Sequence, residues 1–220
     1  MPHQLRADLL DLDEATSRLV RTADAVTDDE AAAPSLLPDW SRGHVLTHIA
    51  RNADGMVRLV DWAVTGVETP MYASVEAREA EIEAGAGRSA AELAADVRDS
   101  AGRLREALER LADDETAYDR VVLFGAPRPG AVADSPARTL PYARIREVEI
   151  HHVDLGLATY TEHDWPPPFV ERTLLWVHAR SGPVDVVGEP EEVLAWRLGR
   201  TTGPSLTRLD GSPPGDAPPW

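Results

Sequence analysis

The segment from residue 140 to about residue 158 carries acidic and imidazole side chains at a spacing that could bind a metal ion. At about 100° per residue of an α-helix, Glu147, His151 and Asp154 fall on one narrow stripe. The apolar residues that flank this stripe are Leu140, Ala143, Val148, Ile150, Leu155 and Ala158. A buried ionised carboxylate is unfavourable unless a cation, a proton or a strong donor compensates it. We therefore expect a cation, a proton or a strong hydrogen-bond donor beside Glu147 inside the fold.

A second segment, from Ser41 to about Gly66, also carries polar residues on the helix face that should pack into the core. His48 and Asn52 lie on its apolar side, and His44 lies at the edge of that side. Facing helices of an antiparallel bundle bring inward side chains together, and their metal sites often use ligand pairs at i and i+3 or i+4. One glutamate and two histidines would leave a coordination position open, as in catalytic zinc sites.

Each of these patterns has a second interpretation. An inward histidine such as His48 is commonly a hydrogen-bonded core residue, and Glu147 with His151 could be an i,i+4 ion pair. His44 and His48 form an HxxxH pair, so spacing alone does not decide which of them is the ligand. Asp154 could orient a ligand or a nearby arginine, or it could form a plain buried ion pair.

Four long helices would position these residues. Apolar periodicity predicts helices over residues 4–26, 41–66, 89–113 and 140–158, with a shorter helical pattern within 69–87. Residues 119–138 have the composition of a loop with a short strand at 121–124, and residues 27–40 interrupt the helical pattern. The side of the last helix opposite the polar stripe is typical of an exposed face and carries Tyr142, Arg146, Glu149 and His152. We expect a mainly α fold, an up-down four-helix bundle.

The triple proline at residues 166–168 predicts a domain boundary, because proline cannot continue a helix and stiffens a link. Beyond it the pattern changes to helix, strand, helix and strand over residues 169–181, 182–188, 190–200 and 204–211. We predict a bundle domain over residues 1–165 and a small α+β domain over residues 166–220.

Composition excludes several classes of function. The formal net charge of −16 argues against binding to nucleic acid or to an anionic membrane surface. No apolar stretch reaches the roughly 18 residues that span a bilayer, and the N-terminal sequence lacks a signal-peptide pattern, so we expect a cytoplasmic protein. Cysteine is absent, so any thiol chemistry must use a thiol from outside the protein.

The segment LLPDWSRGHVLTHIARNADG resembles the second-helix signature of the mycothiol-dependent maleylpyruvate isomerase family, and RIREVEIHHVDLGLA resembles its fourth-helix signature. This family joins a DinB-like metal-binding bundle to a small C-terminal domain similar to sterol carrier protein, and the resemblance covers nearly the whole chain. The family's zinc ligands, a histidine of the second helix and a Glu-xxx-His pair of the fourth, match His48, Glu147 and His151. The resemblance thereby selects His48 over His44.

The resemblance also implies a reaction. Zinc would bind the thiolate of mycothiol, the small thiol of actinobacteria, and activate it toward a small electrophile for maleylpyruvate-type cis–trans isomerisation or S-transfer. Arginine binds carboxylates bidentately, and the family's C-terminal Gly-Arg element matches Gly199 and Arg200, so Arg200 is the first candidate for the substrate clamp, before Arg78 and Arg88. A glycine-arginine step after a helix end is also ordinary capping chemistry. Arg200 and Asp154 are the predicted catalytic residues. The residues predicted to bind the cofactor are Asn52, Arg78 and Arg88.

Two other functions fit the same residues. A DinB-like hydrolase could use metal-bound water, and a stress protein could bind the divalent metal without catalysis. The second is disfavoured, because purely structural zinc normally has four closed ligands. We expect a divalent metal, zinc before others, with mycothiol and a small electrophile as partners, in a monomer or weak homodimer.

Overall fold

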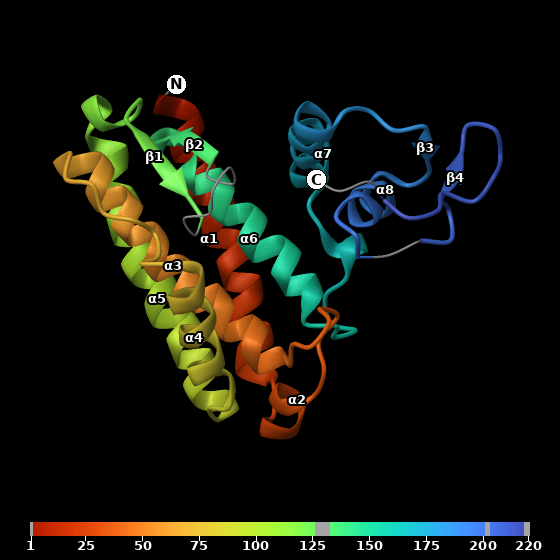
Figure 1. The fold of residues 1–220 in the computed structure, drawn as a ribbon, viewed down its shortest axis with the longest axis horizontal. Helices are drawn as coiled ribbons and strands as arrows, with labels where there is room; N and C mark the ends of the chain where they lie inside the picture. The colour runs from red at the N-terminus through yellow and green to blue at the C-terminus, as the bar shows by residue number, and fades with distance from the viewer. Residues whose placement is uncertain (1, 126–132, 201–202, 218–220) are drawn as a thin grey trace. The chain divides into compact units, whose positions relative to one another are not determined.

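The computed structural model describes residues 2–125, 133–200 and 203–217, and it divides the chain into two compact units (Figure 1). The first unit is Met1–His151 and the second is His152–Trp220. The division therefore falls within the last long helix, earlier in the chain than the triple proline at which the sequence predicts a boundary. No helix in the described ranges combines the length and apolar character that a membrane span requires.

Four long helices build the first unit: α1 (Pro2–Ala25), α3 (Arg42–Thr65), α5 (Ala90–Asp113) and α6 (Leu140–Asp154), of which the last runs into the second unit. They run lengthwise beside one another in Figure 1, with α5 packed against both α1 and α3. Side-chain bonds tie α6 to both neighbours, from Arg18 of α1 to Glu149 and from Arg144 to the Ile49 carbonyl of α3. The predicted mainly α class is confirmed.

The ends of these helices follow from local sequence. Ser41 caps α3 in a capping box with His44, and Ser89 caps α5 in the same way with Glu92. Gly66 ends α3 in the left-handed region at φ 77°, where glycine has no Cβ penalty. The helix predicted to reach residue 158 ends at Asp154 instead, and Gly156 follows it with φ 64°.

Two shorter helices pack on α3. Helix α2 (Asp28–Ala32) forms where the sequence suggested only an interruption, because Thr27 and Glu30 make a capping box. Helix α4 (Val75–Ala86) approaches α3 closely through glycine: a Cβ at Gly43 would lie 2.2 Å from the Ala86 carbonyl oxygen. The absence of that Cβ lets α4 dock against α3, which carries Arg78 to the side of the bundle where His48 lies.

A β-hairpin joins α5 to α6. Strand β1 (Val121–Phe124) pairs antiparallel with β2 (Ala133–Pro136), from Val121 opposite Pro136 to Phe124 opposite Ala133. The predicted strand at 121–124 is confirmed, whereas its partner was predicted as loop. Two short 3-10 helices, η1 (Glu115–Ala117) and η2 (Ala137–Thr139), flank the hairpin.

The face of α6 predicted to be exposed is largely buried. Glu149 is 1% exposed and accepts a hydrogen bond from Arg18 of α1, and His152 is 1% exposed and stacks on Tyr160. The prediction was wrong because it assigned α6 a single covered face. A short central helix can be covered on several sides, and its polar residues then need partners.

The second unit contains η3 (Glu162–Asp164), α7 (Pro167–Ser181), β3 (Val186–Val187), α8 (Pro190–Arg197) and β4 (Thr207–Arg208). Strands β3 and β4 pair antiparallel. Its apolar core consists of Val186, Val193, Trp196 and Leu206. The small α+β character is confirmed, and Pro167 starts a helix, where the missing N–H of proline costs nothing.

Candidate metal centre

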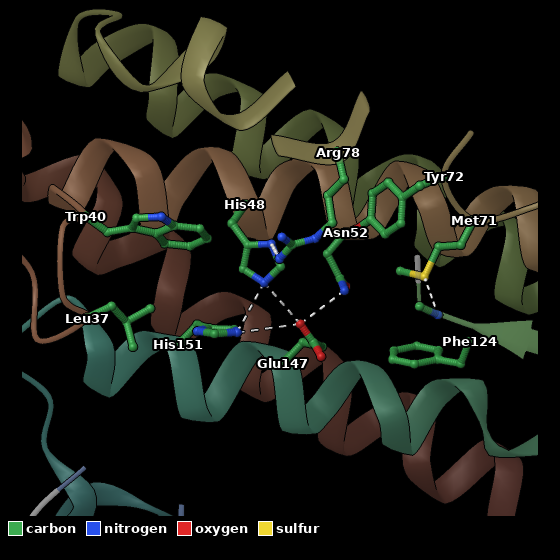
Figure 2. A pocket seen from close by; sticks show the side chains of 11 residues that line it. Leu37, Trp40, His48, Asn52, Met71, Tyr72, Arg78, Phe124, Glu147 and His151 are labelled. Atoms are coloured by element: carbon green, nitrogen blue, oxygen red, sulfur yellow. Dashed lines mark hydrogen bonds and ion pairs between the residues drawn. The ribbon is translucent and has the colours of Figure 1, made fainter. Parts of the chain in front are cut away.

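Helices α3 and α6 bring three donor atoms together (Figure 2). His48 Nε2 lies 3.1 Å from His151 Nε2 and 3.3 Å from Glu147 Oε2, and His151 Nε2 lies 3.6 Å from the same carboxylate oxygen. These side chains form a group that could hold a metal ion. Glu147 and His151 are one helical turn apart and so point the same way, toward His48 on the facing helix.

The donor set fits a tetrahedral divalent ion such as zinc. With bonds of about 2.0–2.1 Å from zinc to nitrogen or oxygen, two ligands of a tetrahedral site are about 3.3–3.4 Å apart. The three measured separations, 3.1 to 3.6 Å, bracket that value. Two imidazole nitrogens and one carboxylate oxygen also match the ligand types that zinc prefers. The arrangement is therefore suited to one ion with coordination positions left for other groups.

The electrostatics of the cluster favour the protonation states that a metal requires. Burial lowers the pKa of His48 to about 4, so its imidazole is neutral at neutral pH. Burial alone would raise the pKa of Glu147, but the hydrogen bond from His48, together with the nearby His151 imidazole and the Arg144 guanidinium, lowers it to about 2. A neutral imidazole and an ionised carboxylate are the metal-binding forms of these side chains.

Behind the cluster, Asn52 connects Glu147 to a buried arginine. Arg144, 2% exposed, donates from Nη1 to Asn52 Oδ1 at 2.7 Å and to the Ile49 carbonyl at 2.9 Å. Because guanidinium only donates, this contact fixes the Asn52 amide so that its NH₂ group faces Glu147 Oε2 at 3.0 Å. Asn52, which the sequence predicted as a cofactor-binding residue, thus holds the carboxylate in place.

The other nitrogen of the His48 ring faces α4. Arg78 Nη2 lies 3.1 Å from His48 Nδ1, and its guanidinium also sits over the Tyr72 ring, 5.8 Å from the ring centre. The ring of Trp40 packs against His48 at 5.6 Å between centres. These contacts restrict the rotation of the imidazole.

The cluster opens onto a cavity of about 380 Å³, large enough for a small organic ligand. Its wall is part polar and part apolar, as Figure 2 shows. The described residues that line it are Leu37, Trp40, His48, Asn52, Met71, Tyr72, Arg78, Phe124, Gly125, Glu147 and His151. Of the residues predicted as sites, the cavity brings together His48, Asn52, Arg78, Glu147 and His151.

The remaining predicted residues lie in other contacts. His44 completes the α3 cap with Ser41 and bonds Glu83 at 3.1 Å, away from the donor cluster. Arg88 forms an ion pair with Asp96 at 2.7 Å. In the second unit, Arg200 donates hydrogen bonds to the Asp154 carboxylate from Nε at 3.0 Å and from Nη2 at 2.9 Å.

Tyr72 and Arg144 are the polar residues of this region that the sequence did not single out. Arg144 could have been found, because it lies three residues before Glu147 on the same apolar stripe of the helix. Tyr72 follows a proline-containing connection without periodicity, so no local pattern indicated its burial.

The chain is similar to known proteins in sequence and in fold. The sequence profile described as the mycothiol maleylpyruvate isomerase N-terminal domain matches residues 12–156. Two solved structures are similar over the full chain: a mycothiol-dependent maleylpyruvate isomerase (TM-score 0.87) and a variant of it with a histidine replaced by alanine (TM-score 0.86). Each is 27% identical in sequence, and the match covers 100% of this chain and 99% of that structure. No curated protein sequence gives a significant match.

Proposed function

The chain belongs to the mycothiol maleylpyruvate isomerase family, and from that premise we propose that it is an enzyme that uses mycothiol to attack a small electrophile. The expected outcome is cis–trans isomerisation of a maleylpyruvate-type substrate, with S-transfer as the variant in which the thiol stays on the product. The observation that supports this proposal most directly is the convergence of His48, Glu147 and His151 beside a cavity.

We propose that these three side chains hold zinc. When bound, zinc would supply a Lewis acid that lowers the pKa of a thiol entering its open coordination position. The chain itself contributes a neutral imidazole at His48, an ionised carboxylate at Glu147 and the Asn52 contact that orients that carboxylate. The chain contains no cysteine, so the reacting sulfur must come from a separate thiol.

The cavity supports a reaction of an unsaturated small molecule. Trp40, Met71 and Phe124 provide apolar surfaces against which a planar conjugated carbon chain can lie. Figure 2 shows Arg78, Asn52 and the donor cluster between Trp40 on one side and Met71 and Phe124 on the other.

The direct test is thiol dependence of turnover. Zinc-loaded protein, mycothiol and maleylpyruvate should together give the trans isomer, which chromatography or NMR can follow, and omission of mycothiol should abolish conversion. Cobalt-substituted protein should gain sulfur-to-metal charge-transfer absorption when mycothiol is added. His44→Ala is the matched control, because it removes a histidine of the same helix that lies outside the donor cluster.

Two outcomes would contradict the proposal. Full activity without any thiol, together with an unchanged cobalt spectrum, would favour a hydrolase that acts through metal-bound water. Stoichiometric metal without turnover of any electrophile in a panel would favour a metal-binding protein without catalytic function.

A further inference from the structure

The hydroxyl group of Tyr72 is buried without a hydrogen-bond partner in the cavity wall. Tyr72 is 3% exposed, and its Oη is among the buried polar atoms that lack a partner within the described residues. Arg78 lies against this ring, but guanidinium can only donate, so it cannot accept the hydroxyl hydrogen. Buried polar groups in native proteins are almost always paired. We therefore expect a ligand in the cavity to supply the hydrogen-bond acceptor for the Tyr72 hydroxyl group.

Arg78 is the second group at this position with unused bonding capacity. Among the ion pairs of the described residues, Arg78 has no carboxylate partner, whereas nearby Arg88 and Arg51 both bind Asp96. Arg144 also lacks a carboxylate partner, but it donates to Asn52 and to the Ile49 carbonyl. Arg78 instead lines the cavity, where its described contacts are His48 and the Tyr72 ring. Its charge is available to an anion in the cavity.

The contact between Arg78 and His48 depends on which ring nitrogen carries the hydrogen. Arg78 can donate to Nδ1 only while the hydrogen sits on Nε2. A metal bound to Nε2 requires the hydrogen on Nδ1, and two donors would then face each other. With the metal in place, Arg78 must turn to another acceptor, and the cavity beside Tyr72 is within its reach.

We propose that Tyr72 and Arg78 together form the binding site for a carboxylate of the electrophile, next to the donor cluster. This inference rests on the proposed function and specifies which side chains recognise the substrate. The Tyr72 hydroxyl donates to one carboxylate oxygen and the guanidinium binds the carboxylate as its counter-ion. Burial raises the pKa of Tyr72 to about 12, so the hydroxyl keeps its hydrogen at neutral pH. An apolar wall of Met71 and Phe124 then lies along the rest of the substrate.

The test is calorimetric binding of maleylpyruvate to the zinc-loaded protein without thiol, so that no turnover occurs. Tyr72→Phe and Arg78→Gln should each raise the Kd about tenfold or more, because each removes a hydrogen bond to a charged group. Metal content should stay the same in both variants. The diester of maleylpyruvate, which carries no charge, should bind the wild type and both variants equally.

Matched controls separate this role from simple packing. Tyr118→Phe removes another buried hydroxyl, which donates to the Ala112 carbonyl at 2.8 Å, and should lower the melting temperature without changing the Kd. Tyr72→Phe removes an unpaired hydroxyl, so it should not lower the melting temperature. Arg110→Gln, a change in an exposed ion pair with Asp61, should leave the Kd unchanged.

The failure of this inference can be told apart from failure of the proposed function. No binding of maleylpyruvate by the wild type, or equal binding by wild type and both variants, would overturn the carboxylate site even if thiol-dependent turnover is found. Binding that depends on Tyr72 and Arg78 in a protein that never uses mycothiol would uphold the site and overturn the proposed function.

Discussion

Helix α6 carries two polar clusters on one stripe, and the structure completes them in opposite ways. Near the middle, Glu147 and His151 meet His48, so that three atoms able to ligate a metal converge beside a cavity. At the end, the fully buried carboxylate of Asp154 accepts hydrogen bonds from Nε of Arg200 at 3.0 Å and from its Nη2 at 2.9 Å. The first cluster gathers three potential metal ligands, whereas the second pairs an acceptor with a donor.

This difference separates a candidate site from a structural contact. A bidentate pair between carboxylate and guanidinium satisfies both partners and needs nothing further. Converging imidazole and carboxylate atoms gain most when a cation sits between them. The sequence predicted catalytic roles for Asp154 and Arg200. That role stays a prediction, and their mutual bond supplies a structural role that experiments must separate from it.

The largest expected effect is loss of metal from the donor cluster of His48, Glu147 and His151. His48→Ala, Glu147→Ala and His151→Ala should each lower zinc affinity at least about a hundredfold, because each removes one of three protein ligands. Elemental analysis and competition with a chromogenic chelator measure this. His44→Ala should keep the metal and lose only about 1 kcal/mol of stability through the α3 cap. Metal loss in His44→Ala with retention in His48→Ala would show that the cluster is assigned to the wrong histidine.

Breaking the ion pair between Arg200 and Asp154 should mainly lower the stability of the fold. Arg200→Ala leaves the buried Asp154 carboxylate without this cation and should lower the free energy of unfolding by about 3 kcal/mol. Zinc content per folded chain should not change. Thermal melts beside steady-state kinetics decide the matter: an unchanged melting temperature with reduced kcat/KM would mean that Arg200 contacts the substrate.

A smaller effect is expected at Asn52, which contacts Glu147 of the donor cluster. Asn52→Ala removes the donor that orients Glu147 and should lower zinc affinity about 10- to 100-fold, as loss of a residue that positions a ligand does. Ser100→Ala is the matched control, because Ser100 is also fully buried and bonds only the Val97 carbonyl of its own helix in the contacts described. Unchanged affinity in Asn52→Ala would show that Glu147 is held without it.

The smallest effect tests the wall of the cavity. A Cβ at Gly55 would lie 2.7 Å from Met71 Cγ and 3.1 Å from the Met71 carbonyl oxygen, so Gly55→Ala should displace the Met71–Tyr72 segment and cost about 1–3 kcal/mol. Gly102→Ala, with nothing within 4 Å, should instead raise stability by about 1 kcal/mol. Chemical denaturation of both variants compares the two. Equal effects would show that the space at Gly55 is not needed.

Local patterns in the sequence were enough to predict α1, α3 and α5 and their ends. Apolar periodicity placed α1, α3 and α5 closely, and Ser41, Gly66 and Ser89 lie at the helix ends they were expected to mark. Such signals work because capping and amphipathic spacing involve residues within about four positions of one another. The same range covers Glu147 and His151, so their shared direction could be predicted.

The contact partners of the polar residues near the cluster were decided by the tertiary structure. The spacing in the sequence did not distinguish His44 from His48. In the folded chain His48 contacts Glu147 of α6, whereas His44 contacts Glu83 of α4. The sequence also gave no sign that Tyr72 would be buried beside Arg78. For Asp154 it offered a nearby arginine or a buried ion pair as alternatives, but it did not identify Arg200 as the partner. These contacts join residues far apart in the chain. Which charges face each other is therefore set by packing of the elements, which no local pattern encodes.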